Sequence, residues 1–155
     1  VSAGNLIASK RHDLTIRAVA KLVPEYPDIQ LTICGEGPER ESLERLVSSL
    51  GIEKHIKLTG HISRQELAGI LLSSDIFVLP SSFETFGLVY VEAMAAGLPV
   101  IATKCGGPED FINTENGLLI PCDDLPALIK AIQQMIAMHN TYDKQKLQRD
   151  VIKHS

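Results

Sequence analysis

One stretch in the middle of the chain constrains its fold more than any other feature. It consists of a short apolar segment, a polar loop, a longer apolar segment and a second short apolar segment. Residues 76–79 have the sequence Ile-Phe-Val-Leu and precede Pro80, and residues 100–102 have the sequence Val-Ile-Ala. Short apolar runs bounded by turn residues are typical of buried strands. Residues 81–87 form the polar loop, and a helix is expected from Leu88 onward. The order strand, loop, helix, strand predicts two parallel strands joined by a crossover.

The junction between this loop and the helix has the features of an anion site. Gly87 lies there, and a glycine lets the backbone approach a ligand closely. The first turn of the helix presents free N–H groups and the positive end of the helix dipole. Glu84 precedes that turn, and Glu92 lies one turn beyond Leu88. Because an ionised carboxylate accepts hydrogen bonds from hydroxyls, the pair predicts a ligand that carries both phosphate and sugar hydroxyls, such as a nucleotide sugar.

The rest of the chain alternates in the same way, with each apolar segment followed by a pattern typical of an amphipathic helix. Further strands are expected at residues 1–4, 29–34, 56–60 and 116–121. The alternation predicts an α/β fold: a Rossmann-like, doubly wound parallel sheet of about six strands with helices on both faces. Residues 1–140 are expected to form this unit, and residues 141–155 a C-terminal tail that is either helical or frayed.

Capping residues indicate where several helices begin and end. Ser63 and Glu66 have the spacing of a capping box, which places a helix start near Arg64. Gly51 is placed to end the preceding helix, and Asp123 or Asp124 to begin the last long one.

Loops that follow strands carry the candidate binding residues. Ligands of such sheets bind beyond the carboxyl ends of the strands, so these loops are expected to gather on one rim. They carry Asn5, Lys10, Gly35, Gly37, Glu84 and Gly106. Gly35-Glu36-Gly37 also begins the G-x-G-x-x-G turn of nicotinamide-dependent enzymes, but Arg40 occupies the position of the third glycine. This departure argues against an oxidoreductase.

Composition excludes other classes of function. A net charge of −4 and the absence of Trp argue against a nucleic-acid binder. Neither His12, His55 nor any cysteine has partners at metal-ligand spacing, so no metal site is expected. No apolar run is long enough to span a membrane. The odd number of cysteines, three, favours buried thiols in a reducing, cytoplasmic compartment over disulfides.

A series of motifs resembles one known family. The segments are residues 33–39 (Ile-Cys-Gly-Glu-Gly-Pro-Glu), residues 58–62 (Leu-Thr-Gly-His-Ile), residues 74–81, residues 84–87 (Glu-Thr-Phe-Gly) and residues 92–100. Together they resemble the C-terminal, donor-binding half of a retaining glycosyltransferase of family 4, the GT-B type with two Rossmann domains. The resemblance covers nearly the whole chain, from Gly4 to the last long helix. It implies a metal-independent hexosyltransferase of polysaccharide biosynthesis that uses a nucleoside-diphosphate sugar as substrate and needs no cofactor.

The resemblance also implies roles for individual residues. Glu84 would reach hydroxyls of the donor sugar, Glu92 would hold the ribose hydroxyls, and Lys10 would neutralise phosphate charge. Backbone groups would supply the remaining contacts: N–H groups around Phe86, Gly87 and Leu88 for the sugar and diphosphate, and the backbone near His61 and Ile62 for the base.

Two departures from the family's pattern affect these expectations. Asn5 stands where the family commonly has Arg, and Arg11 stands where it commonly has Gly, so leaving-group stabilisation is expected to rest more on the helix start or on Arg11. The N-terminal, acceptor-binding half is absent from the chain, which begins at Val1 without Met and is therefore interpreted as part of a longer protein. The piece is expected to bind a nucleoside diphosphate weakly and to transfer no sugar, and the full-length protein could associate peripherally with a membrane.

Alternatives stay open at this point. A nucleotide-sugar epimerase or phosphorylase has the same two-domain build, and a non-catalytic nucleotide-binding module would carry the same rim. For Lys10, a solvated surface lysine is nearly as good an interpretation as a phosphate ligand. Donor base, donor sugar and acceptor are not determined by these residues.

Overall fold

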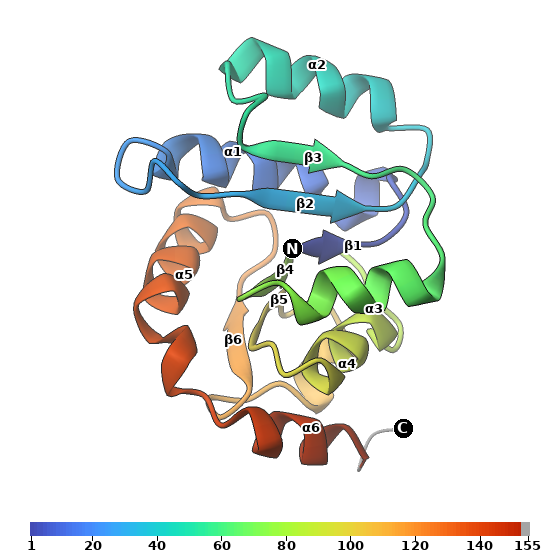
Figure 1. Ribbon diagram of the computed structural model, residues 1–155, viewed down its shortest axis with the longest axis vertical. Helices are drawn as coiled ribbons and strands as arrows, with labels where there is room; N and C mark the ends of the chain where they lie inside the picture. The colour runs from blue at the N-terminus through green and yellow to red at the C-terminus, as the bar shows by residue number, and fades with distance from the viewer. Residues whose placement is uncertain (153–155) are drawn as a thin grey trace.

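The computed structural model describes residues 1–152. In this part of the chain the strands form two three-stranded parallel sheets, with the orders β1-β2-β3 and β4-β5-β6 (Figure 1). The strands are β1 (Ser2–Ala3), β2 (Leu31–Cys34), β3 (Ile56–Leu58), β4 (Phe77–Leu79), β5 (Val100–Thr103) and β6 (Gly117–Ile120).

Backbone hydrogen bonds of Val1 join the two sheets between β1 and β4. The Val1 nitrogen donates to the carbonyl of Ile76 at 2.9 Å, and the Val78 N–H donates to the carbonyl of Val1 at 3.0 Å. The strands therefore follow one another across the molecule in the order β3-β2-β1-β4-β5-β6, which is the order of the doubly wound Rossmann fold. The predicted fold class is confirmed, and the change of direction in strand order lies between β1 and β4.

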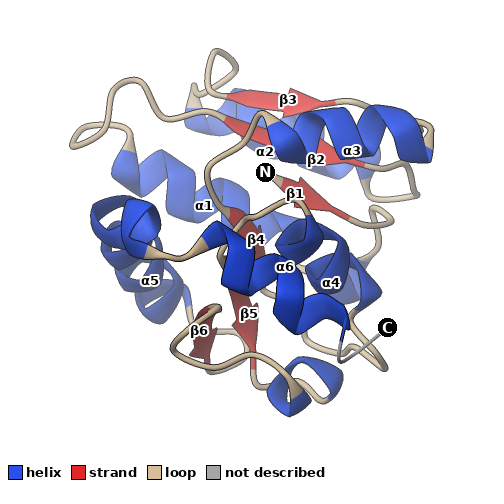
Figure 2. Cartoon of the chain, turned by 60° about the horizontal axis from the view of Figure 1, so that its bottom comes forward, coloured by secondary structure: helices blue, strands red, loops and turns tan. Residues whose placement is uncertain are grey.

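Helices cover both faces of the strands (Figures 1 and 2). They are α1 (His12–Leu22), α2 (Arg40–Leu50), α3 (Arg64–Leu72), α4 (Leu88–Ala95), α5 (Leu125–Met138) and α6 (Lys144–Ile152), with 3-10 turns η1 (Ala8–Lys10), η2 (Gly107–Asp110) and η3 (His139–Thr141). One buried cluster joins α1, α2 and α5, and a second joins α3 and α4. Along β4, Val78 belongs to the first cluster and Phe77 and Leu79 to the second, as the period of two along a strand requires.

Helix ends follow the capping residues of the sequence. The Ser63 side chain accepts from the Glu66 N–H at 3.1 Å, and Gly51 ends α2 in the left-handed conformation with a φ of 66°. Of the two aspartates before α5, Asp124 is the cap, because its side chain accepts from the Ala127 N–H at 2.9 Å.

The C-terminal segment of the described chain forms α6, which lies beside α4 (Figure 2). Its Leu147 side chain is completely buried. Within residues 1–152, no helix is both long enough and apolar enough to cross a membrane.

Candidate functional site

An open hollow lies at the carboxyl ends of β1 and β4, where the strand order changes direction. Its volume is about 380 Å³. It is lined by Ala3, Gly4, Asn5, Lys10, Glu84, Thr85, Phe86, Gly87, Leu88 and Val89. Ligands of doubly wound sheets bind at this place because the loops after the two central strands diverge there. Six of the candidate residues thus come together: Asn5, Lys10, Glu84, Phe86, Gly87 and Leu88.

Glu84 contributes a carboxylate to the lining of this hollow, and two side chains of the protein hydrogen-bond to it. Its side chain is 9% exposed and accepts from the Lys10 ammonium at 2.6 Å. The hydroxyl of Ser81 donates to it at 2.8 Å. Both donors contact the same oxygen, Oε1, and Oε2 makes no hydrogen bond to any residue of the described chain. One oxygen is therefore held by the protein, while the other remains able to accept from a ligand.

The start of α4 has the geometry of an anion site. Gly87 precedes the helix with a φ of 69°, and a Cβ atom added there would lie 2.8 Å from the ring of Tyr90. The position therefore needs glycine for its conformation and for its contact. The N–H groups of Leu88 and Val89 donate to no carbonyl within residues 1–152, so they are available to a ligand at the positive end of the helix dipole.

Tyr90 fixes this helix start to the core. Its side chain is completely buried, its hydroxyl donates to the carbonyl of Leu79 at 2.6 Å, and its ring packs edge-on against Phe77 with centroids 5.6 Å apart. Burial raises the pKa of Tyr90 far above its usual value, so the hydroxyl stays protonated and remains a donor. The first turn of α4 is consequently tied to the end of β4.

The loop after β5, which contains Gly106 and Gly107, packs against the backbone of the loop that carries Glu84. Gly106 forms a bridge with Glu84, and the Gly107 N–H donates to the Glu84 carbonyl at 3.1 Å. A Cβ atom at Gly107 would lie 2.5 Å from the carbonyl oxygen of Thr85. The sequence placed Gly106 on the rim, but it assigned no role to Gly106, Gly107 or Ser81. The adjacent glycines directly after a strand were the available signal.

Glu92 lies outside the lining of the hollow. Its side chain is 35% exposed and accepts from the guanidinium of Arg64 at 2.8 Å, whose own side chain is 92% exposed. Arg64 is the first residue of α3, and sequence reasoning gave it no role. The carboxylate of Glu92 is thus occupied in the free protein by a partner that is almost fully solvated.

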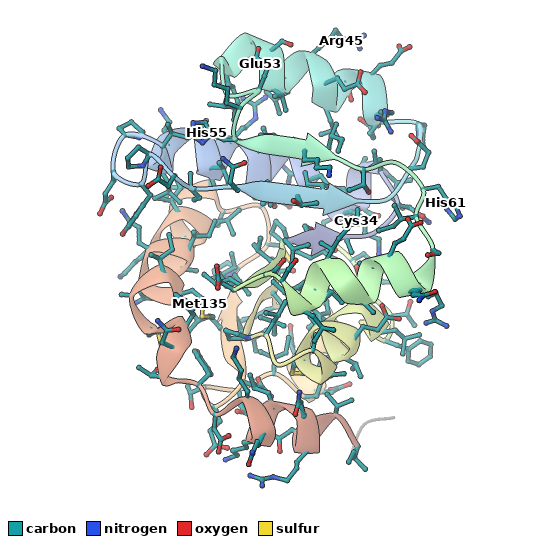
Figure 3. The ribbon with its side chains drawn as sticks, in the orientation of Figure 1. Cys34, Arg45, Glu53, His55, His61 and Met135 are labelled. Carbon is teal, nitrogen blue, oxygen red and sulfur yellow. The ribbon has the colours of Figure 1, made fainter. Side chains whose placement is uncertain are left out.

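The remaining donor-binding candidates follow β2 and β3 at the same carboxyl edge. Gly35 bridges Gly60, with its N–H donating to the Gly60 carbonyl at 3.2 Å, and a Cβ atom at Gly35 would collide with the carbonyl of Gly4. Gly35 is therefore required by the packing of neighbouring loops. His61 projects outward from the loop between β3 and α3 (Figure 3), and Ile62 lines a separate shallow hollow of about 500 Å³.

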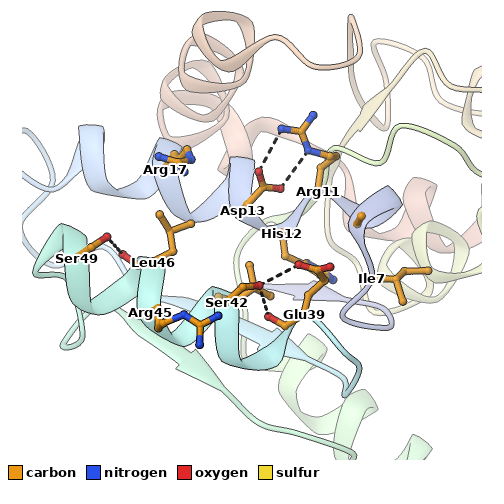
Figure 4. Close-up of a pocket in the computed structure, with 12 residues that line it drawn as sticks. Ile7, Arg11, His12, Asp13, Arg17, Glu39, Ser42, Arg45, Leu46 and Ser49 are labelled. Atoms are coloured by element: carbon orange, nitrogen blue, oxygen red, sulfur yellow. Dashed lines mark hydrogen bonds and ion pairs between the residues drawn. The ribbon is translucent and has the colours of Figure 1, made fainter.

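Arg11 is directed away from the Lys10–Glu84 hollow. It directly precedes α1 as the N-cap residue, in the left-handed conformation with a φ of 52°. Its side chain donates to Asp13 at 3.1 Å and also pairs with Asp123. The hydrogen bond to Asp13 raises the pKa of Arg11. The side chain lines a different hollow of about 530 Å³ between α1 and α2 (Figure 4). Of the two cations considered from the sequence, the structure brings Lys10 to Glu84 and directs Arg11 elsewhere.

His12 supports the loop that carries Asn5. The ring is 2% exposed, and its Nε2 atom lies 3.3 Å from the carbonyl oxygen of Asn5. Burial lowers the pKa of His12, which favours the neutral imidazole. Within residues 1–152, no group of three or more His, Cys, Asp or Glu side chains is arranged to hold a metal ion.

Comparison with known proteins gives consistent matches. The family model described as "Glycosyl transferases group 1" matches residues 1–153. A GDP-mannose-dependent alpha-(1-6)-phosphatidylinositol monomannoside mannosyltransferase of Mycolicibacterium smegmatis is 34% identical over 145 residues, which cover 88% of this chain and 38% of that protein. The chain therefore spans well under half the length of this relative.

Solved structures match over nearly the entire chain. The sucrose-phosphate synthase of Thermosynechococcus elongatus superposes with a TM-score of 0.88 at 31% identity, covering 99% of this chain and 40% of that chain. A pneumococcal O-GlcNAc transferase, solved in complex with UDP and GlcNAc, superposes with a TM-score of 0.89 at 26% identity, covering 99% of this chain and 32% of that chain.

Proposed function

Because this chain belongs to the group 1 glycosyl transferases, we propose that it binds the donor substrate of such an enzyme, a nucleoside-diphosphate sugar, in the hollow between the ends of β1 and β4. The observation that carries the proposal is the meeting of Lys10 and Glu84 beside the free N–H groups at the start of α4. A cation and a helix start suit a diphosphate, and a half-occupied carboxylate suits sugar hydroxyls.

The proposed chemistry is transfer of a hexosyl group with retention of configuration at the sugar carbon. The bond between the sugar and the diphosphate breaks, and negative charge grows on the leaving diphosphate. Lys10 and the N–H groups of Leu88 and Val89 would stabilise that charge, because they are fixed donors placed where it develops. Glu84 would orient the sugar through Oε2, and Glu92 would exchange Arg64 for the ribose hydroxyls. The leaving phosphate would assist the incoming acceptor hydroxyl.

Acceptor binding is assigned to a part of the enzyme outside this chain. The matched relatives are more than twice as long as the matched region, and the hollow described here is open on one side. We therefore expect the 155-residue chain to bind nucleotides without transferring sugar. By their names, the relatives include a phosphatidylinositol monomannoside mannosyltransferase, an O-GlcNAc transferase and a sucrose-phosphate synthase, so they differ in acceptor.

Calorimetric titration tests the proposal. The chain would be titrated with UDP, GDP and ADP, with their sugar conjugates, and with NADH. Binding of one nucleoside diphosphate, strengthened by its sugar, is the expected result, and it would also identify the base. Binding of NADH without binding of any nucleoside diphosphate would refute the proposal in favour of an oxidoreductase.

A further inference from the structure

Ser81 is a buried hydroxyl that contacts the candidate sugar-binding carboxylate from the protein side. Its side chain is completely buried, two residues beyond the end of β4, and its Oγ atom donates to Glu84 Oε1 at 2.8 Å. Lys10 donates to the same oxygen. These two donors leave Oε2 without a partner in the described chain.

Ser81 is itself fixed to the core. The buried hydroxyl of Thr103, at the end of β5, donates to the Ser81 carbonyl. Tyr90 donates to the carbonyl of Leu79, two residues earlier. The backbone that carries Ser81 is thus tied to β5 and to α4, whereas Lys10 reaches Glu84 from a 3-10 turn at the surface through a flexible side chain that is 20% exposed.

The two donors differ in what happens to them when a diphosphate enters the hollow. Lys10 is the cation among the residues that line the hollow, and a diphosphate would attract its ammonium more strongly than one carboxylate does, because it carries more charge. Ser81 is neutral and buried, so it gains nothing from leaving Glu84. It is then the donor that remains on Oε1, and it holds the carboxylate without cancelling its charge.

Resting on the proposed function, we infer that Ser81 is a positioning residue: it keeps Oε2 of Glu84 facing the donor sugar and thereby determines how much affinity the sugar adds to that of the nucleoside diphosphate. The observation behind the inference is the convergence of Ser81 and Lys10 on one oxygen of Glu84. Ser81 acts through Glu84 and touches no ligand itself.

The test compares two ratios of affinity. Calorimetry would give the dissociation constants of GDP and GDP-mannose, and of UDP and UDP-N-acetylglucosamine, for the wild-type chain and for Ser81→Ala. The expected result is that Ser81→Ala lowers the gain contributed by the sugar by about threefold to tenfold, the effect of one lost hydrogen bond, and leaves nucleoside diphosphate affinity within about twofold. Ser82→Ala is the matched control, because the Ser82 hydroxyl donates to the Ser9 carbonyl and makes no contact with Glu84.

A double-mutant cycle separates positioning from a general loss of structure. In a Glu84→Ala background, Ser81→Ala should change neither affinity, because the group that it positions is gone. If Ser81→Ala does not fold, Thr103→Val replaces it: this variant removes the donor to the Ser81 carbonyl and should reduce the sugar gain in the same direction. Thermal unfolding of each variant establishes folding.

The outcomes are distinguishable. An unchanged sugar gain in Ser81→Ala overturns the inference, and so does an equal loss for diphosphate and sugar conjugate or a loss that persists without Glu84. If the wild-type chain binds a nucleoside diphosphate and its sugar conjugate with equal affinity, the inference is overturned, but the proposal that the chain binds nucleotides still stands. A wild-type chain that binds no nucleotide refutes the proposed function itself, and the inference with it.

Discussion

Replacing Lys10 by methionine separates a structural ion pair from a phosphate ligand. Lys10 and Glu84 are 20% and 9% exposed, and their atoms lie 2.6 Å apart. Methionine keeps most of the side-chain length and removes the charge, so Glu84 is left with Ser81 alone. Loss of one hydrogen bond between charged groups at a partly buried site costs about 1.5–3 kcal/mol. For a chain of this size the free-energy loss corresponds to a fall in Tm of roughly 3–12 °C. Circular dichroism on heating measures it.

The double variant Lys10→Met/Glu84→Gln then decides between the two roles. It removes both charges, so no unpaired carboxylate is buried and most of the lost stability should return. Affinity for a nucleoside diphosphate should stay low, by about tenfold or more, because the phosphate has lost its cation. Lys21→Met, an exposed lysine of α1, is the control and should change neither quantity. Recovery of affinity together with stability in the double variant would show that Lys10 serves Glu84 alone, and the phosphate role would be refuted.

Three further predictions concern the elements around the hollow. Gly87→Ala should destabilise the chain by about 2–4 kcal/mol in denaturant unfolding, because it forces a left-handed alanine against the ring of Tyr90. The control Gly69→Ala, in open space within α3, should leave stability unchanged or raise it by up to about 1 kcal/mol, and equal losses in the two variants would contradict the argument. Arg64→Ala should leave Tm unchanged and raise nucleoside diphosphate affinity by about fivefold or less in calorimetry, because an exposed pair is worth about 0–1 kcal/mol and its loss frees Glu92; a tenfold loss would make Arg64 a ligand instead. Since burial depresses the pKa of His12 below its ordinary value of 6.5, stability should be complete above that pH and decline as the pH falls below it; His12→Gln should flatten this decline between pH 7 and 5 in urea titrations, and an unchanged slope would exclude His12 as its source.

The fold could be predicted from the sequence because its determinants are local. Alternating apolar segments gave the strands and helices, and the caps at Ser63, Gly51 and Asp124 lie where their side chains or backbone conformations require. The α2 helix starts at Arg40, whose N–H closes a turn onto the Gly37 carbonyl. Interactions between residues close in sequence determine such features, so they can be predicted from one sequence.

The candidate site was predictable in its backbone and less so in its side-chain pairing. Gly87 and the start of α4 are encoded by neighbouring residues, whereas the contact of Lys10 with Glu84 spans 74 positions. Arg11 illustrates the difference. Proximity in sequence to Lys10 suggested a second cation over the diphosphate, but its left-handed backbone turns the side chain toward Asp13 and Asp123. The carboxylate with which a surface cation such as Arg11 pairs depends on which loops the sheet brings together. The spacing of apolar residues along the sequence does not determine that pairing.

The hollow lies where the strand order changes direction, so loops from three different strands meet there and contribute a cation, a carboxylate and glycines. The β1 loop supplies Lys10, the β4 loop supplies Ser81 and Glu84, and the β5 loop supplies the glycines behind them. In the free protein the cation and the carboxylate satisfy each other, so neither charge is left buried and unpaired. A ligand that brings both phosphate and hydroxyls can separate them and satisfy each one, whereas inorganic phosphate would take Lys10 and leave Glu84 with a single neutral donor. On the proposed function, the pair is therefore expected to favour a ligand that carries both groups over one that carries either alone.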